Sequence, residues 1–544
     1  MFRTYFLLPI LIPLAFIQGN FAEGLFHRLE GWVERLATKP ARMVLFVGVV
    51  SFVICAGLSL NTGILAPQTH DEFGYLLLGD TFAHGRVTNP PPPLWQHFET
   101  IHEIMLPTYT AKYPPGQGVA LALGEVLGSP IIGVWISTAL ACAAMCWMLL
   151  AWVPARWALA GGLLTAFHPL VLAWSQNYWG GAVAMGGGAL VLGGFRRLLT
   201  EMRARDATMT GTGIMILANS RPYEGLLFCL LVALALLIWT IKTRKFGTRP
   251  FFLRLVAPLA VMMALLACEV GYYNWRVTGN PLEMPYMVHI QTYGIDPVFI
   301  FSEPRPEPVF RHREIRELQE AYLSYYLSQR SSWSSLLKAT AGKLEELFKE
   351  YLWSLLLVVP LLGLPWALRR DRMVLLAFLI GVFFVVGLAL ETWMHTHYAA
   401  PGAAVFFLLV TASMRELGGW HCQGRHAGRN ALRGLAVLLA ISFVSTTIKL
   451  ADVDHTKWYW QRQAILNRLK QEPERSLVIV KYDPNHNPNR EWVYNEADMI
   501  NAKVILARDM GEKNKELLDY FHDRKAWVLH ADVAKPQLEP YPGS

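Results

Sequence analysis

The sequence predicts an α-helical polytopic membrane protein of about eleven spans, followed by a small C-terminal α/β soluble domain. Its 544 residues are 53% hydrophobic and only 17% charged, whereas soluble domains carry roughly 25% charged residues. The apolar residues form runs long enough to cross a bilayer, separated by polar loops. From residue 451 onward these long runs stop. Together, the three observations separate a membrane domain from a soluble one.

The N-terminal segment, residues 1–42, has two parts. The stretch 5–17 is apolar, but it is short and interrupted by Pro9 and Pro13. It fits a signal-like segment, an additional span or an interfacial helix. The stretch 24–42 is amphipathic and basic, so we expect it on the cytoplasmic surface next to the first clear span.

The predicted membrane domain covers residues 43–450, with two long external loops at 61–129 and 271–350. Spans are assigned where an apolar run is bounded by polar or charged residues. The spans are 43–60, 130–151, 157–174, 182–195, 209–218, 226–241, 251–269, 351–366, 374–390, 400–413 and 435–448.

The charged residues give an independent test of these spans. Every cluster of Lys and Arg falls on one side, and the loops rich in His, Tyr, Trp, Asn and carboxylates fall on the other. Basic clusters mark the cytoplasmic side. We therefore expect a bacterial inner-membrane protein whose polar loops and C-terminal domain are periplasmic. No soluble segment carries a basic stripe interleaved with aromatic residues, which argues against a nucleic-acid partner.

The six cysteines do not indicate metal or redox chemistry. All except Cys422 lie in apolar runs, and the sequence contains no Cys-x-x-Cys pair. Small apolar packing residues are the simpler interpretation.

Residues 451–544 predict a small parallel or mixed sheet with a helix. Three short apolar runs read as strands, and one stretch with helical spacing lies between the second and the third. The strands are 476–481, 502–507 and 526–530, and the helix is 513–523. The domain lacks a Gly-rich phosphate loop, so we expect no nucleotide site in it.

Two adjacent carboxylates, Asp71 and Glu72, follow the first clear span. One interpretation is a cap for the next helix. The other is catalysis: a carboxylate beside the membrane can take the proton from an acceptor hydroxyl as it attacks the anomeric carbon of a sugar. Adjacent residues on a helix point about 100° apart. One carboxylate would then face the reaction, and the other would orient it or bind substrate.

Two cations lie near the predicted external face, each in a short motif. Lys112 and Tyr113 begin a stiff Lys-Tyr-Pro-Pro-Gly turn. The lysine is either a partner for a leaving phosphate or a side chain reaching toward the membrane surface. Arg221 breaks the positive-inside pattern and needs an anionic partner, which could be Glu224 or a phosphate. Tyr223 lies between them and is included as a substrate-binding residue.

Aromatic and imidazole groups complete the candidate site. His395, His397 and Tyr398 precede a span. A His-x-His pair can bind zinc, but no third ligand lies nearby in the sequence, so we favour hydrogen bonds to phosphate or sugar. Tyr178 lies in a polar loop and could stack on a sugar ring, although tyrosines also line membrane surfaces. We expect no cofactor, and a divalent metal stays open as an alternative.

The motifs resemble the GT-C superfamily of integral-membrane glycosyltransferases, which includes the protein O-mannosyltransferases, the ArnT-like transferases and the RgtA/B/C/D-like group of glycosyltransferase family 39. The acidic pair Asp71-Glu72 after the first span and the element Lys112-Tyr113-Pro114-Pro115 carry the resemblance, which covers residues 40–415. It implies that the sugar donor is a polyprenyl-phosphate sugar and that membrane lipid is a further partner. It also implies a glycan, lipid or protein acceptor, Asp71 as the residue that acts as base or positions the acceptor, and Lys112 and Arg221 as phosphate partners.

Two other functions remain in view. A transporter or flippase of a lipid-linked substrate predicts ionisable residues in the middle of spans. Here most of them gather at span ends, with His168 and Glu269 as exceptions. A scaffold that only presents the C-terminal domain gives no reason for several polar loops to converge.

Overall fold

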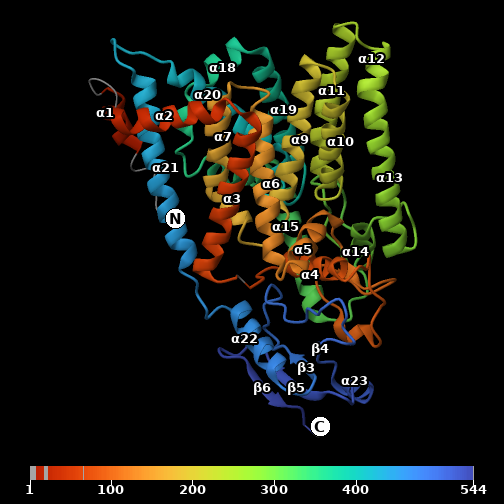
Figure 1. The fold of residues 1–544 in the computed structure, drawn as a ribbon. Helices are drawn as coiled ribbons and strands as arrows, with labels where there is room; N and C mark the ends of the chain where they lie inside the picture. The colour runs from red at the N-terminus through yellow and green to blue at the C-terminus, as the bar shows by residue number, and fades with distance from the viewer. Residues whose placement is uncertain (1–7, 17–21, 65, 543–544) are drawn as a thin grey trace.

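The computed structural model describes residues 8–16, 22–64 and 66–542. A bundle of long helices forms the larger part, and a small sheet with its helices lies beyond one end of the bundle (Figure 1). This arrangement confirms the predicted fold class, a helical membrane domain with a C-terminal α/β domain.

Seven helical segments among the described residues are long and apolar enough to cross a membrane. An eighth is added if α18 (Leu364–Arg370) and α19 (Arg372–Leu388), which are bent by 119° relative to each other, form one span. The protein is therefore a multi-pass membrane protein. The seven are α3 (Pro40–Thr62), α6 (Pro130–Leu149), α9 (Gly181–Thr200), α11 (Pro222–Lys242), Arg249–Thr278, Ala400–Gly418 and α21 (Ala427–Ala451). Within them, Arg249–Thr278 comprises α12 (Arg249–Phe251), a π-helix (Phe252–Val256) and α13 (Ala257–Thr278), and Ala400–Gly418 comprises a 3-10 turn (Ala400–Gly402) and α20 (Ala403–Gly418).

The expected number of about eleven spans is larger because some apolar runs are interrupted. The run 157–174 is divided between α7 (Ala155–Phe167) and α8 (Pro169–Trp174), since proline cannot continue the hydrogen bonding of α7. The run 351–366 turns through three consecutive residues of positive φ before α17 (Val358–Leu361). The run 209–218 lies in α10 (Ala204–Ala218), which is short and packs between α9 and α13.

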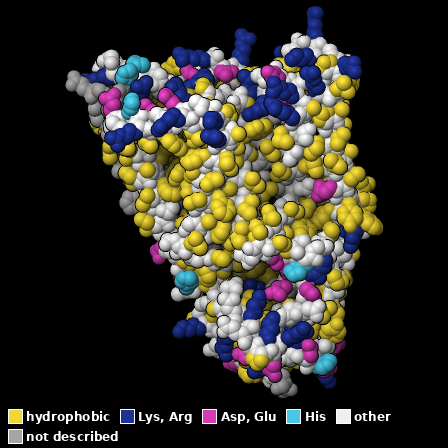
Figure 2. Space-filling view, in the orientation of Figure 1, with side chains coloured by type: hydrophobic (Ala, Val, Ile, Leu, Met, Phe, Trp, Pro, Cys, Tyr) yellow, Lys and Arg dark blue, Asp and Glu magenta, His cyan; other side chains and the backbone are white. Residues whose placement is uncertain are grey.

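The surface matches the predicted sorting of charge. Figure 2 shows an apolar band around the middle of the molecule, with Lys and Arg crowded at its upper edge, away from the C-terminal domain. The N-terminal helix α2 (Glu23–Ala37) lies at that edge, and α1 (Leu11–Ala15) packs against α21 (Figure 1). Residues 5–7 and 17 of the predicted apolar stretch lie outside the described residues. Which compartment each edge faces stays a prediction.

Both long segments that we expected as external loops contain helices. The first contains α4 (His70–Ala83), a 3-10 turn (Trp95–Phe98), the hairpin β1 (Glu103–Ile104) and β2 (Thr110–Ala111), and α5 (Pro115–Val126). The second begins later than predicted, because α13 continues to Thr278 rather than ending near residue 270. It contains α14 (Pro285–Tyr293), α15 (Arg313–Arg330) and α16 (Trp333–Tyr351).

The C-terminal domain holds a mixed four-stranded sheet in the order β4-β3-β5-β6. The central strand β3 runs parallel to β4 and β5, and β6 runs antiparallel to β5. All three predicted strands are present, and β6 and α22 are additional. The elements are α22 (Trp458–Gln471), β3 (Ser476–Lys481), β4 (Val504–Arg508), a 3-10 turn (Gly511–Lys513), α23 (Asn514–Tyr520), β5 (Lys525–His530) and β6 (Gln537–Pro540).

The two faces of this sheet pack against different parts of the molecule, because successive side chains of a strand point to opposite faces. Val478 and Val480 pack in a cluster with Leu469 of α22. Leu477 and Ile479 instead share a buried cluster with the first external segment, whose contributors are Leu77, Phe98, Met105 and Tyr109. One apolar core therefore joins the soluble domain to the membrane domain.

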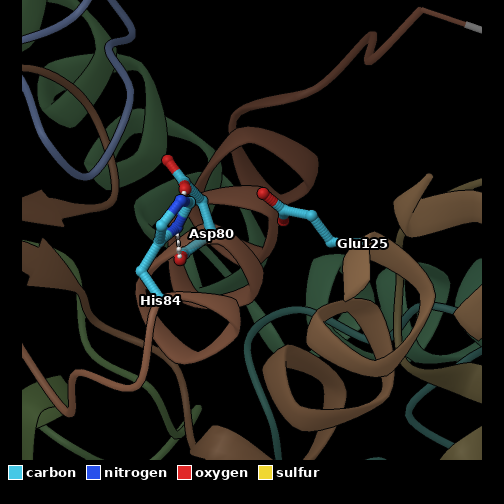
Figure 3. A group of neighbouring side chains, drawn as sticks. All are labelled: Asp80, His84 and Glu125. Atoms are coloured by element: carbon cyan, nitrogen blue, oxygen red, sulfur yellow. Dashed lines mark hydrogen bonds and ion pairs between the residues drawn. The ribbon is translucent and has the colours of Figure 1, made fainter. Parts of the chain in front are cut away.

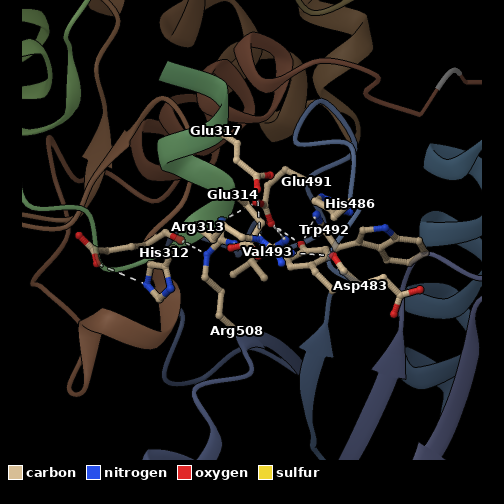
Figure 4. A network of polar contacts seen from close by, with 12 residues as sticks. His312, Arg313, Glu314, Glu317, Asp483, His486, Glu491, Trp492, Val493 and Arg508 are labelled. Atoms are coloured by element: carbon tan, nitrogen blue, oxygen red, sulfur yellow. Dashed lines mark hydrogen bonds and ion pairs between the residues drawn. The ribbon is translucent and has the colours of Figure 1, made fainter. Parts of the chain in front are cut away.

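A buried polar network reinforces this junction (Figure 4). Arg508, at the end of β4, donates to Glu491 of its own domain and to the backbone oxygen of Glu99, 2.6 Å away. Its guanidinium also lies 3.3 Å from Glu314 of α15. Arg508 and Glu491 have side chains with at most 2% exposure, so each charge depends on the other for compensation.

Candidate functional site

The candidate site begins at the N-terminus of α4. Thr69 is the N-cap residue, and Glu72 completes a capping box with it. The Glu72 carboxylate accepts the backbone N–H groups of Gln68 at 2.7 Å, Thr69 at 3.1 Å and Tyr178 at 3.2 Å. Burial raises the pKa of Glu72, while these N–H groups act in the opposite direction. Glu72 therefore occupies the capping position that the sequence offered as one interpretation, and it also anchors the loop that contains Tyr178.

Asp71 occupies a different environment. Tyr113 donates its hydroxyl to Oδ1 of Asp71, and Nδ1 of His102 lies 3.0 Å from the same oxygen. Burial acts to raise the pKa of Asp71, but His102, the charge of Lys112 and the Tyr113 hydroxyl together hold it well below its usual value. The Asp71 side chain stays 34% exposed. Asp71 is therefore an ionised carboxylate at neutral pH whose Oδ1 is engaged and whose side chain is partly exposed.

The Lys-Tyr-Pro-Pro turn holds Tyr113 and Lys112 beside Asp71. The Tyr113 ring stacks on Tyr75 of α4 at 4.3 Å, and a Cβ on Gly74 would come within 2.9 Å of that ring. Nζ of Lys112 lies 5.4 Å from the ring centres of both Tyr113 and Tyr286. Burial lowers the pKa of Lys112 to about 8, against the opposing charges of Asp71 and Asp296. The two ring faces attract the ammonium group and so favour its charged form.

Arg221 lies directly before α11. Its guanidinium lies 4.5 Å from the ring centre of Tyr398 and 3.8 Å from Oε1 of Glu224. The turn that carries Arg221 is tied to the Lys-Tyr-Pro-Pro turn, because the Gly116 N–H donates to the backbone oxygen of Asn219 at 2.7 Å. Tyr223 contacts α19 instead. Its hydroxyl donates to the backbone oxygen of Gly387, at the end of that helix, at 3.0 Å.

A series of ring contacts and one hydrogen bond connects the histidines to the start of α4. Tyr398 packs edge-on against His397 at 4.8 Å, and His395 stacks parallel to His397 at 5.7 Å. His397 packs against Trp179 at 4.5 Å, and the indole N–H of Trp179 donates to the Thr69 hydroxyl at 2.9 Å. Thr69 is two positions before Asp71 in the chain. Burial lowers the pKa of His397, so its ring is neutral, and its Nδ1 is buried without a hydrogen-bond partner among the described residues.

Most of the residues predicted from the sequence are therefore brought into one continuous cluster. Tyr178 is in it as a packing residue, because its ring is buried with Tyr75 and Tyr113. Tyr223 is adjacent to the cluster but engaged by α19. The gathered residues are Asp71, Glu72, Lys112, Tyr113, Tyr178, Arg221, Glu224, His395, His397 and Tyr398.

Sequence reasoning missed several members of the site. His102 contacts both Asp71 and the Tyr113 hydroxyl, 2.7 Å away, yet it lies in the middle of a loop without a motif. Burial lowers the pKa of His102 to about 4, so the ring is neutral at neutral pH. Tyr286 comes from α14, and no spacing in the sequence links it to Lys112. For both residues, the sequence shows only an isolated polar residue in a long external segment.

The C-terminal domain also reaches the site, which the sequence did not predict. The Tyr494 hydroxyl lies 2.7 Å from Nδ1 of His70, the residue before Asp71. The Tyr494 ring stacks on Phe73 at 4.1 Å. Further along α4, Asp80 accepts the backbone N–H of Ala497 at 2.7 Å. The soluble domain thus holds α4 near both of its ends.

One group among the described residues could offer ligand atoms to a metal ion: Asp80, His84 and Glu125 (Figure 3). Nδ1 of His84 lies 2.9 Å from Oδ1 of Asp80, and burial raises the pKa of Glu125 to about 7. Carboxylate and imidazole ligands would suit a divalent metal. The group lies at the end of α4 opposite to Asp71, roughly 14 Å away along the helix, so it is separate from the candidate base.

No protein-family model matches the chain, and no curated protein matches its sequence. Solved structures do match. ArnT from Cupriavidus metallidurans bound to undecaprenyl phosphate has a TM-score of 0.53 at 13% identity, over 94% of this chain and 98% of that one. Its apo form has a TM-score of 0.52 at 13% identity, over 88% and 92%.

A second enzyme has a similar architecture. The oligosaccharyltransferase of Archaeoglobus fulgidus, in complex with Zn and sulfate, matches with a TM-score of 0.50 and 11% identity. The match covers 89% of this chain and 67% of that one. Both neighbours extend over the membrane domain and beyond it, and at this identity what they show is architecture. The chain therefore has the same overall fold as these structures, the GT-C fold.

Proposed function

We propose that the chain is a membrane glycosyltransferase that moves a sugar from a polyprenyl-phosphate donor to a hydroxyl group of a glycan, lipid or protein acceptor on the periplasmic face. One observation carries the proposal. Asp71, an ionised and partly exposed carboxylate, lies in one cluster with two cations, Lys112 and Arg221. It interacts electrostatically with both of them. A base beside two cations is the arrangement that displacement of a phosphate from a sugar requires.

The proposed reaction is a single displacement. Oδ2 of Asp71 takes the proton from the acceptor hydroxyl while that oxygen forms a bond to the anomeric carbon. The bond from the anomeric carbon to the phosphate oxygen breaks, and its electron pair leaves with the polyprenyl phosphate. The configuration of the anomeric carbon is inverted, and the proton on Asp71 later passes to water.

The neighbouring residues have distinct roles in this proposal. Tyr113 and His102 hold Oδ1, which fixes the direction of Oδ2 and keeps the carboxylate ionised. Lys112 and Arg221 stabilise the charge that develops on the leaving phosphate. Glu72 positions α4 and the Tyr178 loop. Because phosphate is a good leaving group, the proposed reaction needs neither a metal nor a cofactor.

The fold is consistent with this donor, since a solved structure with the same architecture holds undecaprenyl phosphate. The two polar residues that kept a transporter in view have structural partners. His168 interacts with the backbone oxygen of Tyr351 at 3.0 Å. Glu269 accepts the side-chain amide of Asn219 at 2.7 Å. Both join segments of the bundle to each other, and this favours an enzyme over a carrier.

The decisive experiment compares Asp71→Asn with the wild-type protein in reconstituted membranes. The donors are undecaprenyl phosphates carrying radiolabelled glucose, mannose, galactose or aminoarabinose, and the readout is label released from the lipid. We expect Asp71→Asn to lower the rate by about 10²–10⁴-fold, the usual contribution of a general base. Asp519→Asn, at an exposed carboxylate on α23, serves as the matched control. Wild-type rates in Asp71→Asn would refute the proposal.

A further inference from the structure

The C-terminal sheet has a topological switch point. The segment after β3 leads to β4 on one side, whereas β5 lies on the other side of β3 and continues into β6, away from β3. The chain therefore leaves the carboxyl ends of β3 and β5 in opposite directions. In open sheets with parallel strands, ligands bind in the crevice that opens at such a point.

A pocket that is open to solvent, with mostly exposed lining residues, lies at this crevice. Its volume is about 570 Å³, within the range of small-molecule sites. The segment after β3 and the residue two positions after β5 supply its walls. The lining residues are Asp483, Pro484, Asn485, Asn487, Arg490 and Asp532. Topology and cavity thus indicate the same place independently of each other.

Internal hydrogen bonds hold the walls in place. Asp532 accepts the backbone N–H of Asp483 at 2.8 Å, and its other oxygen lies 2.7 Å from Nδ1 of His486. The His486 ring packs against Tyr482 at 4.0 Å. Nε2 of His486 is buried and has no hydrogen-bond partner among the described residues. These contacts tie the segment after β3 to the residue Asp532 after β5.

Five of the six residues that line the pocket have polar side chains. The two asparagine amides both donate and accept hydrogen bonds, the carboxylates accept them, and Arg490 donates. Two carboxylates against one guanidinium disfavour a phosphate. The guanidinium disfavours a metal ion, and both oxygens of Asp532 are already engaged. This combination suits a neutral ligand rich in hydroxyl groups.

The pocket faces the membrane domain. The backbone oxygen of Asp483 accepts a hydrogen bond of 2.6 Å from Arg313 at the start of α15 (Figure 4). Nine residues further along α15, roughly 14 Å, Tyr322 packs against Trp393 at 5.3 Å and interacts electrostatically with Asp71. One rigid helix therefore runs from the pocket to the candidate site.

We propose that this pocket binds a neutral sugar. We assign that sugar to the glycan part of the acceptor, which the soluble domain presents to Asp71. This assignment rests on the proposed function. A transferase that recognises a sugar some distance from the reacting hydroxyl would use this binding to place its acceptor.

The test measures binding rather than transfer. Saturation-transfer NMR on the full-length protein in detergent would use glucose, galactose, mannose, N-acetylglucosamine and their common disaccharides as probes. We expect at least one of them to bind to the wild-type protein. Asn485→Ala and Arg490→Ala should each weaken binding by about 5–10-fold, the effect of one lost hydrogen bond. Asn501→Ala, an exposed asparagine of the same domain outside the pocket, should bind as the wild type does.

Three outcomes would overturn the pocket assignment: no binding of any neutral sugar, unchanged binding in both pocket variants that melt like the wild type, or binding of calcium alone in a parallel titration. Asp71→Asn separates the two proposals. It should bind the sugar normally, so a failure of the transferase proposal would appear in the transfer assay and leave this binding measurement intact.

Discussion

We expect Glu72 to act on the reaction only through the position of α4, and two substitutions test this. The contacts of its two oxygens are unequal. Oε2 accepts the N–H groups of Gln68 and Thr69, while Oε1 accepts that of Tyr178. In Glu72→Gln the amide oxygen can replace Oε2, which leaves one N–H without an acceptor. In Glu72→Ala all three lose their acceptor.

The magnitudes follow from these contacts. An unsatisfied buried N–H group costs about 1–3 kcal/mol. We therefore expect Glu72→Gln to destabilise the first turn of α4 by about 2 kcal/mol. For Glu72→Ala we expect about 4–5 kcal/mol, since water would satisfy part of the freed groups. At about 1.4 kcal/mol per factor of ten, the first change corresponds to roughly 30-fold faster local opening.

Hydrogen exchange over residues 66–83 measures this opening, and the initial transfer rate at low temperature measures activity. We expect Glu72→Gln to exchange faster and still to transfer sugar within about fivefold of wild type, far above Asp71→Asn. The reasoning would be refuted if Glu72→Gln kept wild-type protection of α4 but lost activity by more than 10²-fold, because Glu72 would then act directly on the substrate.

Further predictions concern the cations, the domain junction and metals. Because burial lowers the pKa of Lys112 to about 8, its charge is lost as the pH rises through that value. We expect kcat/KM for the donor to fall above about pH 8 and Lys112→Arg to remove that fall in a pH–rate profile. Arg508→Met should weaken the junction by about 3–5 kcal/mol by leaving Glu491 buried and unpaired, measured by thermal unfolding, and the double change with Glu491→Gln should recover part of the loss. Tyr494→Phe removes the hydrogen bond to His70 but keeps the stacked ring, so a stability loss of only about 0.5–1.5 kcal/mol is expected in the same unfolding measurement. EDTA should leave the transfer rate unchanged, and a loss that zinc restores would assign catalysis to a metal.

The sequence predicted those parts of the architecture that depend on residues close together in the chain. Long apolar runs predicted the membrane helices, and short apolar runs predicted strands 476–481, 502–507 and 526–530, which are β3, β4 and β5. The break within the run 157–174 did not follow, since an apolar run looks the same whether or not Pro169 divides it. The extent of α13 was also missed, because Tyr272 and Trp275 read as a loop although they continue a helix.

The site residues also divide into those that a local sequence pattern predicted and those that it did not. The cations near Asp71 were found because their positions violate the charge pattern of a membrane protein or mark a stiff turn. His102 was not found, since an isolated histidine in a long segment carries no periodic signal. The contact between His70 and Tyr494 joins residues 424 positions apart, and no local rule connects them. Such pairs depend on how the two domains pack.

That packing explains why the soluble domain matters to the proposed chemistry. Asp71 is directed by the first turn of α4, and three independent attachments fix this turn. Glu72 ties it to the Tyr178 loop, Tyr494 binds His70 and stacks on Phe73, and the sheet face of Leu477 and Ile479 packs against Leu77 two turns later. Two of the three come from the C-terminal domain. A catalytic carboxylate must be held within a fraction of an ångström of its working position. We therefore infer that the soluble domain is part of the catalytic scaffold, and that its role goes beyond presenting a substrate.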